Sequence, residues 1–180
     1  MKYSLVTISG LPGSGTSTTS SKLSSNLNWS YINAGDIFRA LADEADMTLH
    51  QFGNRAETDP TIDRDLDKKM IRYAENSEPL VMEGRLVGWM TKKKKIPALR
   101  VWLEAAISTR VNRLSLRERD SQALENMKMR EQSELKRYKD FHEIDLRDLS
   151  IYDLVINTDS YSADQVVTKI KHRLTGDVNC

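Results

Sequence analysis

Short apolar runs alternate with longer polar stretches along this 180-residue chain. Five runs have the length and composition of strands: residues 3–8, 29–32, 79–82, 100–103 and 152–156. Continuous apolar strands separated by intervals long enough for a helix are typical of a parallel sheet covered on both faces. Connections between parallel strands normally contain a helix. The pattern therefore predicts an α/β fold with a five-stranded parallel sheet.

The helix expected between the first two strands is unusually polar. Residues 16–28 contain only Leu23 and Leu27 as an apolar pair at i, i+4 spacing, among many serines and threonines. Such a segment is a poor helix by itself, so we expect packing against the sheet to stabilise it. The next helix, from residue 36 to residue 45, has a clear apolar side.

Residues 46–77 interrupt the alternation of strands and helices. Thr48 and Gln51 form a capping-box pair before a short helix, and Pro60 is suited to the first position of another. Apolar residues at i, i+4 spacing then predict one face of that second helix: Ile62, Leu66, Met70 and Ala74. We interpret this stretch as a helical insertion between the second and third strands.

Composition excludes several classes of protein. The net charge is +1, and the single cysteine, Cys180, permits neither an internal disulfide nor a cysteine-based zinc cluster. No apolar run approaches the roughly 20 residues that span a bilayer, and the N-terminal residues lead directly into a strand. We therefore expect a cytoplasmic protein with no signal peptide and no membrane or nucleic-acid partner. The lysine run 92–95 is expected to be an exposed turn.

The stretch SGLPGSGTST, residues 9–18, nearly matches a phosphate-binding loop. Gly10, Gly15 and Ser17 fit the pattern Gly-x4-Gly-Lys-Ser/Thr, whereas Thr16 occupies the lysine position. The loop follows a strand and opens a helix, so its backbone N–H groups and the helix N-terminus can bind phosphate. Ser17 is the expected Mg²⁺ ligand. The predicted ATP-binding residues are Gly10, Leu11, Pro12, Gly13, Ser14, Gly15, Thr16, Ser17 and Thr18.

Threonine cannot supply the positive charge that lysine brings to phosphoryl transfer, so another cation is needed. Arg130 and Arg137 are seven residues apart in the highly charged segment 107–148, and we favour them as that source. A second row on one helical face comprises Arg110, Arg113 and Arg117. The alternative is that these charges form solvated ion pairs on a helical pair.

Two further clusters follow strands at the edge where ligands of open α/β sheets bind. After the third strand, Glu83 could hold the water ligands of Mg²⁺ or receive a substrate hydroxyl, with Arg85 beside it. After the second strand, Arg39 could hold an acceptor phosphate while Asp36 orients a sugar or base. The alternative for Glu83 and Arg85 is a strand-end ion pair. The alternative for Asp36 and Arg39 is an acid at a helix N-terminus and a surface cation.

The segments GLPGSGTST, AGDIFR, PLVMEGRLVGWM and REQSELKRYKDFHEIDLRDLSIYDLVINTD together resemble the archaeal cytidylate kinases. The resemblance covers nearly the whole chain. It implies a P-loop three-layer core of residues 1–33, 78–106 and 149–180. A helical monophosphate-binding insertion would comprise about 34–77, and a mobile lid about 107–148.

The resemblance also implies roles for the residues named above. A threonine in the lysine position is ordinary in that family. Arg130 and Arg137 would be lid arginines, and Arg85 would join Asp36 and Arg39 at the monophosphate. The implied reaction transfers phosphoryl from ATP, with Mg²⁺, to CMP or dCMP.

The sequence defines the choice of nucleobase in the acceptor less well than it defines the phosphate loop. Asp63 and Arg64 are candidate readers of the base, and the choice of CMP depends on the resemblance alone. One alternative is a kinase of similar fold that acts on AMP, UMP or a small alcohol such as shikimate; an alcohol acceptor would need a general base, and Glu83 would be that base. A second alternative is an ATP-binding switch that does not transfer phosphate. Without a heptad or a large apolar face, we expect a monomer.

Overall fold

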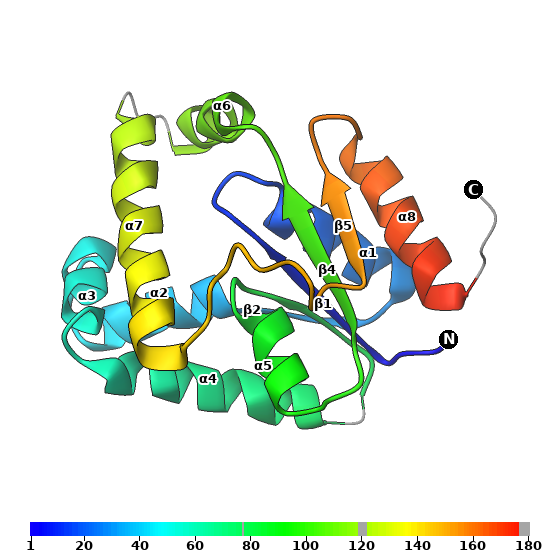
Figure 1. Ribbon diagram of the computed structural model, residues 1–180, viewed down its shortest axis with the longest axis horizontal. Coiled ribbons are helices and arrows are strands. Elements are labelled where there is room, and N and C mark those ends of the chain that lie inside the picture. The colour runs from blue at the N-terminus through cyan, green and yellow to red at the C-terminus, as the bar shows by residue number, and fades with distance from the viewer. Residues whose placement is uncertain (77, 119–121, 177–180) are drawn as a thin grey trace.

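The computed structural model describes residues 1–76, 78–118 and 122–176. Its centre is a five-stranded, entirely parallel sheet in the order β2-β3-β1-β4-β5 (Figure 1). The strands are β1 (Leu5–Gly10), β2 (Ser30–Asn33), β3 (Leu80–Glu83), β4 (Leu99–Glu104) and β5 (Leu154–Asn157). The predicted parallel sheet is thus confirmed, with strand bounds shifted by a few residues.

Helices connect and cover the strands. Those of the core are α1 (Thr16–Leu27), α5 (Val87–Lys93) and α8 (Ala163–Thr175). Between β2 and β3 lie α2 (Ala34–Glu44), α3 (Leu49–Ala56) and α4 (Pro60–Glu75), and between β4 and β5 lie α6 (Ile107–Glu118) and α7 (Ala123–His142). Figure 1 shows α7 standing beside α2, α3 and α4, away from α8. Among the described residues, no helix is both long and apolar enough to cross a membrane.

Each face of the sheet has its own apolar core. On one face, Val6 and Ile8 of β1 pack with Leu23 of α1 and Ile170 of α8, all fully buried. On the other face, Leu5 and Met82 pack against α4, α5 and the end of α7, with Met70 also buried. Consecutive strand residues point to opposite faces, so the alternating assignment of β1 residues to the two cores produces the three layers.

The polar helix α1 is stabilised by packing, as the sequence predicts. Thr19, Ser20, Leu23 and Ser24 are buried, although the helix contains few apolar residues. Small hydroxyl side chains let α1 approach the sheet and α8 closely. The helix therefore depends on the core to form, and its position holds the preceding loop at the end of β1.

The helices between β2 and β3 begin as expected. Thr48 and Gln51 form a reciprocal capping box at α3, and Pro60 occupies the first turn of α4, whose N-cap is Asp59. The buried face of α4 differs from the apolar spacing in its first turn. Asp63 is buried at 4% exposure, whereas Ile62 is only partly buried.

The lysine run 92–95 is exposed, but only its second half is a turn. Lys92 and Lys93 form the last turn of α5, a helix of seven residues, and Lys95 adopts a positive φ of 56°. Lys93 Nζ donates a hydrogen bond to the carbonyl oxygen of His142 at 2.5 Å. The expectation of a simple turn was therefore wrong for the first half, because α5 continues through it and packs beside the end of α7.

Candidate active site

The phosphate-binding loop lies between the end of β1 and the start of α1, as its sequence predicts. Gly13 and Gly15 have φ angles of 80° and 94°, a region that glycine adopts without strain. At Gly13 a Cβ atom would lie 2.6 Å from the carbonyl oxygen of Arg110, so a larger residue would also collide with α6. The loop conformation therefore requires glycine for two separate reasons.

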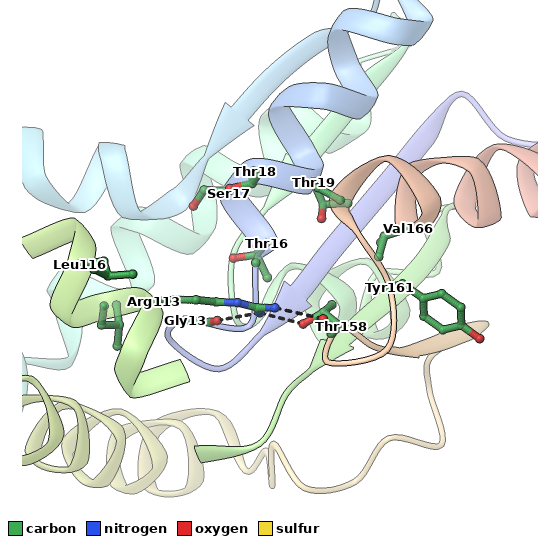
Figure 2. Close-up of a pocket in the computed structure, with 13 residues that line it drawn as sticks. Gly13, Thr16, Ser17, Thr18, Thr19, Arg113, Leu116, Thr158, Tyr161 and Val166 are labelled. Carbon is green, nitrogen blue, oxygen red and sulfur yellow. Dashed lines mark hydrogen bonds between the residues drawn. The ribbon is translucent and has the colours of Figure 1, made fainter. Parts of the chain in front are cut away.

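A cavity of about 580 Å³ opens beside this loop (Figure 2). Its walls come from the loop, the first turn of α1, helix α6, the segment after β5 and the start of α8. The lining residues are Gly13, Gly15, Thr16, Ser17, Thr18, Thr19, Arg113, Leu114, Leu116, Thr158, Tyr161, Ala163 and Val166. The cavity thus combines the backbone donors and hydroxyls of a phosphate site with apolar and aromatic side chains beyond them.

Arg113 joins three parts of this cavity. Its Nη1 donates to the carbonyl oxygen of Gly13 at 3.2 Å and to Oγ1 of Thr158 at 2.9 Å, while Nη2 donates to the Thr158 carbonyl at 3.0 Å (Figure 2). Thr158 Oγ1 in turn donates to the carbonyl of Ser14 at 2.9 Å. The guanidinium therefore holds α6, the phosphate loop and the segment after β5 together.

Arg110, one turn earlier on α6, also contacts the loop. It is 4% exposed, donates to the Pro12 carbonyl at 3.2 Å and pairs with Glu131 of α7. The structure thus places two arginines of the 110/113/117 row against the loop backbone. The side chain of Arg117, the third member of that row, lies outside the described residues.

Glu83, at the carboxyl end of β3, accepts hydrogen bonds on both carboxylate oxygens. Oε1 accepts from Thr16 Oγ1 and Ser17 Oγ, each at 2.7 Å. Oε2 accepts from the Tyr31 hydroxyl and from Asn33 Nδ2, the latter at 2.8 Å. Thr16, which replaces the lysine, therefore donates to a carboxylate. Tyr31 and Asn33 belong to no motif, so the sequence analysis did not identify them. Their i, i+2 spacing along β2 does place both side chains on the same face of the sheet.

Arg85 and Arg130 contact the same carboxylate. Glu134 of α7 pairs with Arg85, and its Oε1 accepts from Arg130 Nε at 3.2 Å. The Arg85 atoms are close to Oε2 of Glu134 without being aligned as a hydrogen bond, so that contact is electrostatic. Glu134 is 8% exposed. Two predicted site arginines thus converge on one buried anion between β3 and α7.

A second buried pair lies between α4 and α7. Arg137 Nε is 3.7 Å from Asp63 Oδ2, and their side chains are 7% and 6% exposed. Burial raises the pKa of Asp63, although Arg137 opposes the shift. Neither of these two atoms has a hydrogen-bond partner. The Arg137 guanidinium carbon is 5.8 Å from the ring centre of Phe38 on α2, so three helices meet here.

Three predicted site residues lie outside this group. Arg64 is exposed on α4, one position beyond the buried Asp63. Asp36 and Arg39 form an exposed ion pair of 2.5 Å in the first turns of α2, with side chains 65% and 49% exposed. The structure brings these two to each other and not to the buried arginines.

The donor set around Ser17 suits a magnesium ion that arrives with ATP. Hydroxyl and carboxylate oxygens are the ligands that this hard cation prefers, and it is usually held by one or two carboxylates plus substrate phosphates. Ser17 Oγ and Glu83 Oε1 already lie 2.7 Å apart at the loop. No group of three or more His, Cys, Asp or Glu side chains that could hold a metal by itself occurs in the described part of the chain.

The family model for the cytidylate kinase-like family matches residues 5–160. The chain belongs to the cytidylate kinase-like family. The matched range includes the phosphate loop, the helices between β2 and β3, and α6 and α7, so the family resemblance noted from the sequence is confirmed.

Curated relatives support the same family. A cytidylate kinase of Methanococcoides burtonii is 47% identical over 165 residues, covering 91% of each chain. A cytidylate kinase of Halobacterium salinarum is 43% identical, covering 90% of this chain and 84% of the relative. These relatives match almost the full length of the present chain, insertion and charged segment included.

Solved structures show the fold alone. A shikimate kinase from Acinetobacter baumannii, in complex with shikimate, has a TM-score of 0.64 at 13% identity and covers 97% of this chain and 95% of that one. A protein from Eubacterium ventriosum has a TM-score of 0.70 at 17% identity, covering 95% and 98%. The fold of this family member is therefore shared with a shikimate kinase.

Proposed function

We propose that this protein is a cytoplasmic, monomeric cytidylate kinase that transfers the γ-phosphoryl group of ATP to CMP or dCMP. Two arrangements support this assignment, beside the family to which the chain belongs. A cavity at the phosphate loop suits a nucleoside triphosphate, and a buried charged group between α2, α4 and α7 suits an anionic acceptor with a polar base. The Asp63–Arg137 pair in that group carries the choice of acceptor.

ATP would bind in the cavity at the phosphate loop. The loop N–H groups and the N-terminus of α1 would receive the phosphates, from Gly10 to Thr18. Arg113 and Tyr161 border the outer part of the cavity, where a base has aromatic and apolar contacts. Mg²⁺, held by Ser17 and by Glu83 directly or through water, would neutralise phosphate charge.

The acceptor base would be read by Asp63 and Arg137. Cytosine presents an exocyclic amine that donates, beside a ring nitrogen and a carbonyl that accept. A buried carboxylate can accept from the amine, and a guanidinium can donate to both acceptors. Uracil places a carbonyl and an N–H at the first two positions, which leaves the carboxylate facing another acceptor. The hydrogen-bonding atoms without partners on both side chains support this pairing, and Phe38 offers a ring to pack on.

The acceptor phosphate would bind the arginines around Glu134. Arg85 and Arg130 already converge on the carboxylate of Glu134, and guanidinium groups of this kind can also bind phosphate oxygens in pairs. Arg39, exposed at the start of α2, would add a contact from the insertion, with Asp36 beside the sugar. In this account residues 34–77 are the monophosphate-binding insertion and residues 107–148 are the lid.

The reaction depends on alignment of the two substrates and on positive charge more than on a general base. The acceptor phosphate has a second pKa of about 6, so it is largely ionised at neutral pH. The lysine's missing charge would be supplied by arginines on the two lid helices. Arg110 and Arg113 lie at the loop, while Arg130 would act at the phosphates and Arg137 at the base as α7 closes over the acceptor. In-line approach and exclusion of water then account for the rate.

A panel of acceptors tests the proposal. ADP release would be measured with ATP, Mg²⁺ and each of CMP, dCMP, UMP, AMP and shikimate. We expect the highest kcat/KM with CMP and dCMP. A preference for AMP or UMP would keep the mechanism and overturn the base assignment. Turnover with shikimate alone would make Glu83 a base for an alcohol, and ATP binding without any turnover would favour a nucleotide switch.

A further inference from the structure

Two side chains of β2, Tyr31 and Asn33, have no part in the reaction as described so far, yet both contact Glu83. Asn33 pairs with Glu83 in the register of β2 and β3. Tyr31 lies two residues earlier, so its side chain is on the same face of the sheet. Both donate to Oε2 of Glu83, Asn33 through Nδ2 at 2.8 Å.

The orientation of the Asn33 amide is determined by a second contact. Its Oδ1 accepts from the backbone N–H of Gly35 at 2.7 Å, which caps the N-terminus of α2. Since the oxygen serves the cap, the amide nitrogen is the atom that faces Glu83. The Asn33 amide also donates to the Tyr31 hydroxyl at 3.2 Å. The donors on β2 thus form a small ordered unit.

The two oxygens of Glu83 are divided between two parts of the fold. Oε2 is held by β2, whereas Oε1 accepts from Thr16 and Ser17 in the first turn of α1, each at 2.7 Å. All four donors are neutral, and none of the ion pairs among the described residues includes Glu83. The carboxylate is therefore oriented without being paired to a cation.

We propose that Tyr31 and Asn33 are positioning residues that hold Oε2 of Glu83, so that Oε1 stays directed at the hydroxyls of Thr16 and Ser17. The inference depends on the proposed kinase function and extends it to residues of β2. It also gives Thr16 a role. A lysine there would pair with Glu83, whereas a threonine orients the same oxygen and leaves its charge available to the magnesium that accompanies ATP.

Tyr31 contacts Oε2 of Glu83 through its hydroxyl group. Removal of the hydroxyl alone, as in Tyr31→Phe, takes away one donor to Oε2 and leaves the ring.

The first experiment compares Tyr31→Phe with the wild-type protein and with Tyr3→Phe, a matched loss of a tyrosine hydroxyl at the start of the chain. We expect kcat to fall about tenfold, equivalent to about 1.4 kcal/mol, with the KM for ATP raised and the KM for CMP changed by less than about twofold. ATP affinity would be measured by calorimetry with and without Mg²⁺. The variant should lose most of the affinity that Mg²⁺ adds while binding metal-free ATP normally. An equal loss in both conditions would indicate a structural role and overturn the inference.

A double-mutant cycle tests whether Tyr31 acts through Glu83. If it does, Tyr31→Phe should lower kcat and the Mg²⁺-dependent ATP affinity in the wild type but have almost no further effect in Glu83→Gln. Additive effects would contradict the inference. Failure of the proposed function would be separate: wild-type protein would then transfer no phosphoryl to CMP, while the calorimetric cycle could still be completed.

Discussion

The assignment of base reading to Asp63 can be tested by Asp63→Asn, which keeps the size of the side chain and removes its charge. An amide oxygen is a weaker acceptor than a carboxylate for the cytosine amine, because charge-assisted hydrogen bonds are roughly twice as strong as neutral ones. We estimate a loss of about 1 kcal/mol for CMP. The amide N–H₂ can donate to the uracil carbonyl, a gain of about 1 kcal/mol for UMP.

These two changes act in opposite directions on the two substrates, and both lower the preference for CMP over UMP. Their sum of about 2 kcal/mol predicts that the ratio of kcat/KM for CMP to that for UMP falls by roughly 30-fold. ADP release with each acceptor measures the ratio directly. Asp65→Asn is the matched control, since Asp65 lies on the same helix with a side chain 62% exposed. That variant should leave the ratio unchanged.

Stability must be measured beside activity, because Asp63 is buried against Arg137. Removal of one partner from a buried ion pair is strongly destabilising in general, so circular dichroism should first establish that Asp63→Asn is folded at the assay temperature. A ratio that stays within twofold of wild type in the folded variant would refute base reading by Asp63. An equal fall in kcat/KM for CMP and UMP would indicate that Asp63 only supports α7.

Three further predictions follow from other contacts. Burial, and next the nearby Asp63 carboxylate, raise the pKa of Asp67 from 3.8 to about 7, so this group lowers the stability of the fold progressively as pH rises through that range. Asp67→Asn should therefore raise Tm clearly more at pH 8 than at pH 5, whereas equal shifts at both pH values would contradict this. Arg113→Ala should weaken ATP binding about tenfold in calorimetry, because the guanidinium joins three walls of the cavity; unchanged affinity would contradict its assignment. Arg130→Ala should lower kcat by roughly 10²-fold; a tenfold loss or less would place the missing charge on other arginines, such as Arg110.

Apolar spacing and loop motifs were sufficient to predict the parallel sheet, the positions of its five strands along the chain and the phosphate loop. These features depend on local sequence, since a buried parallel strand is a continuous apolar run and the loop must follow one. The polar helix α1 could also be anticipated as a helix that depends on packing. The spacing did not determine that Asp63, in place of Ile62, is buried in the first turn of α4, because an arginine from α7 meets it there.

The contacts that each arginine makes could not be predicted from the sequence, for a similar reason. Both rows have helical spacing, but only tertiary packing decides which row contacts the loop. Arg110 and Arg113 contact the loop backbone, whereas Arg130 and Arg137 are engaged by Glu134 and Asp63. Their roles in transfer stay predictions. The Arg130–Glu134 pair has i, i+4 spacing on α7. The contacts of Arg110, Arg113 and Arg137 join distant segments and leave little trace in the periodicity of one helix.

The most direct test of the account is transfer of label from ATP, marked on its γ-phosphorus, to CMP in the presence of Mg²⁺. The products would be separated chromatographically after incubation with wild-type protein. The account predicts labelled CDP, formed with an equal amount of ADP and with little free phosphate. Label that stays in ATP, or appears only as inorganic phosphate, would contradict the claim that a phosphate loop with threonine in place of lysine supports phosphoryl transfer to CMP.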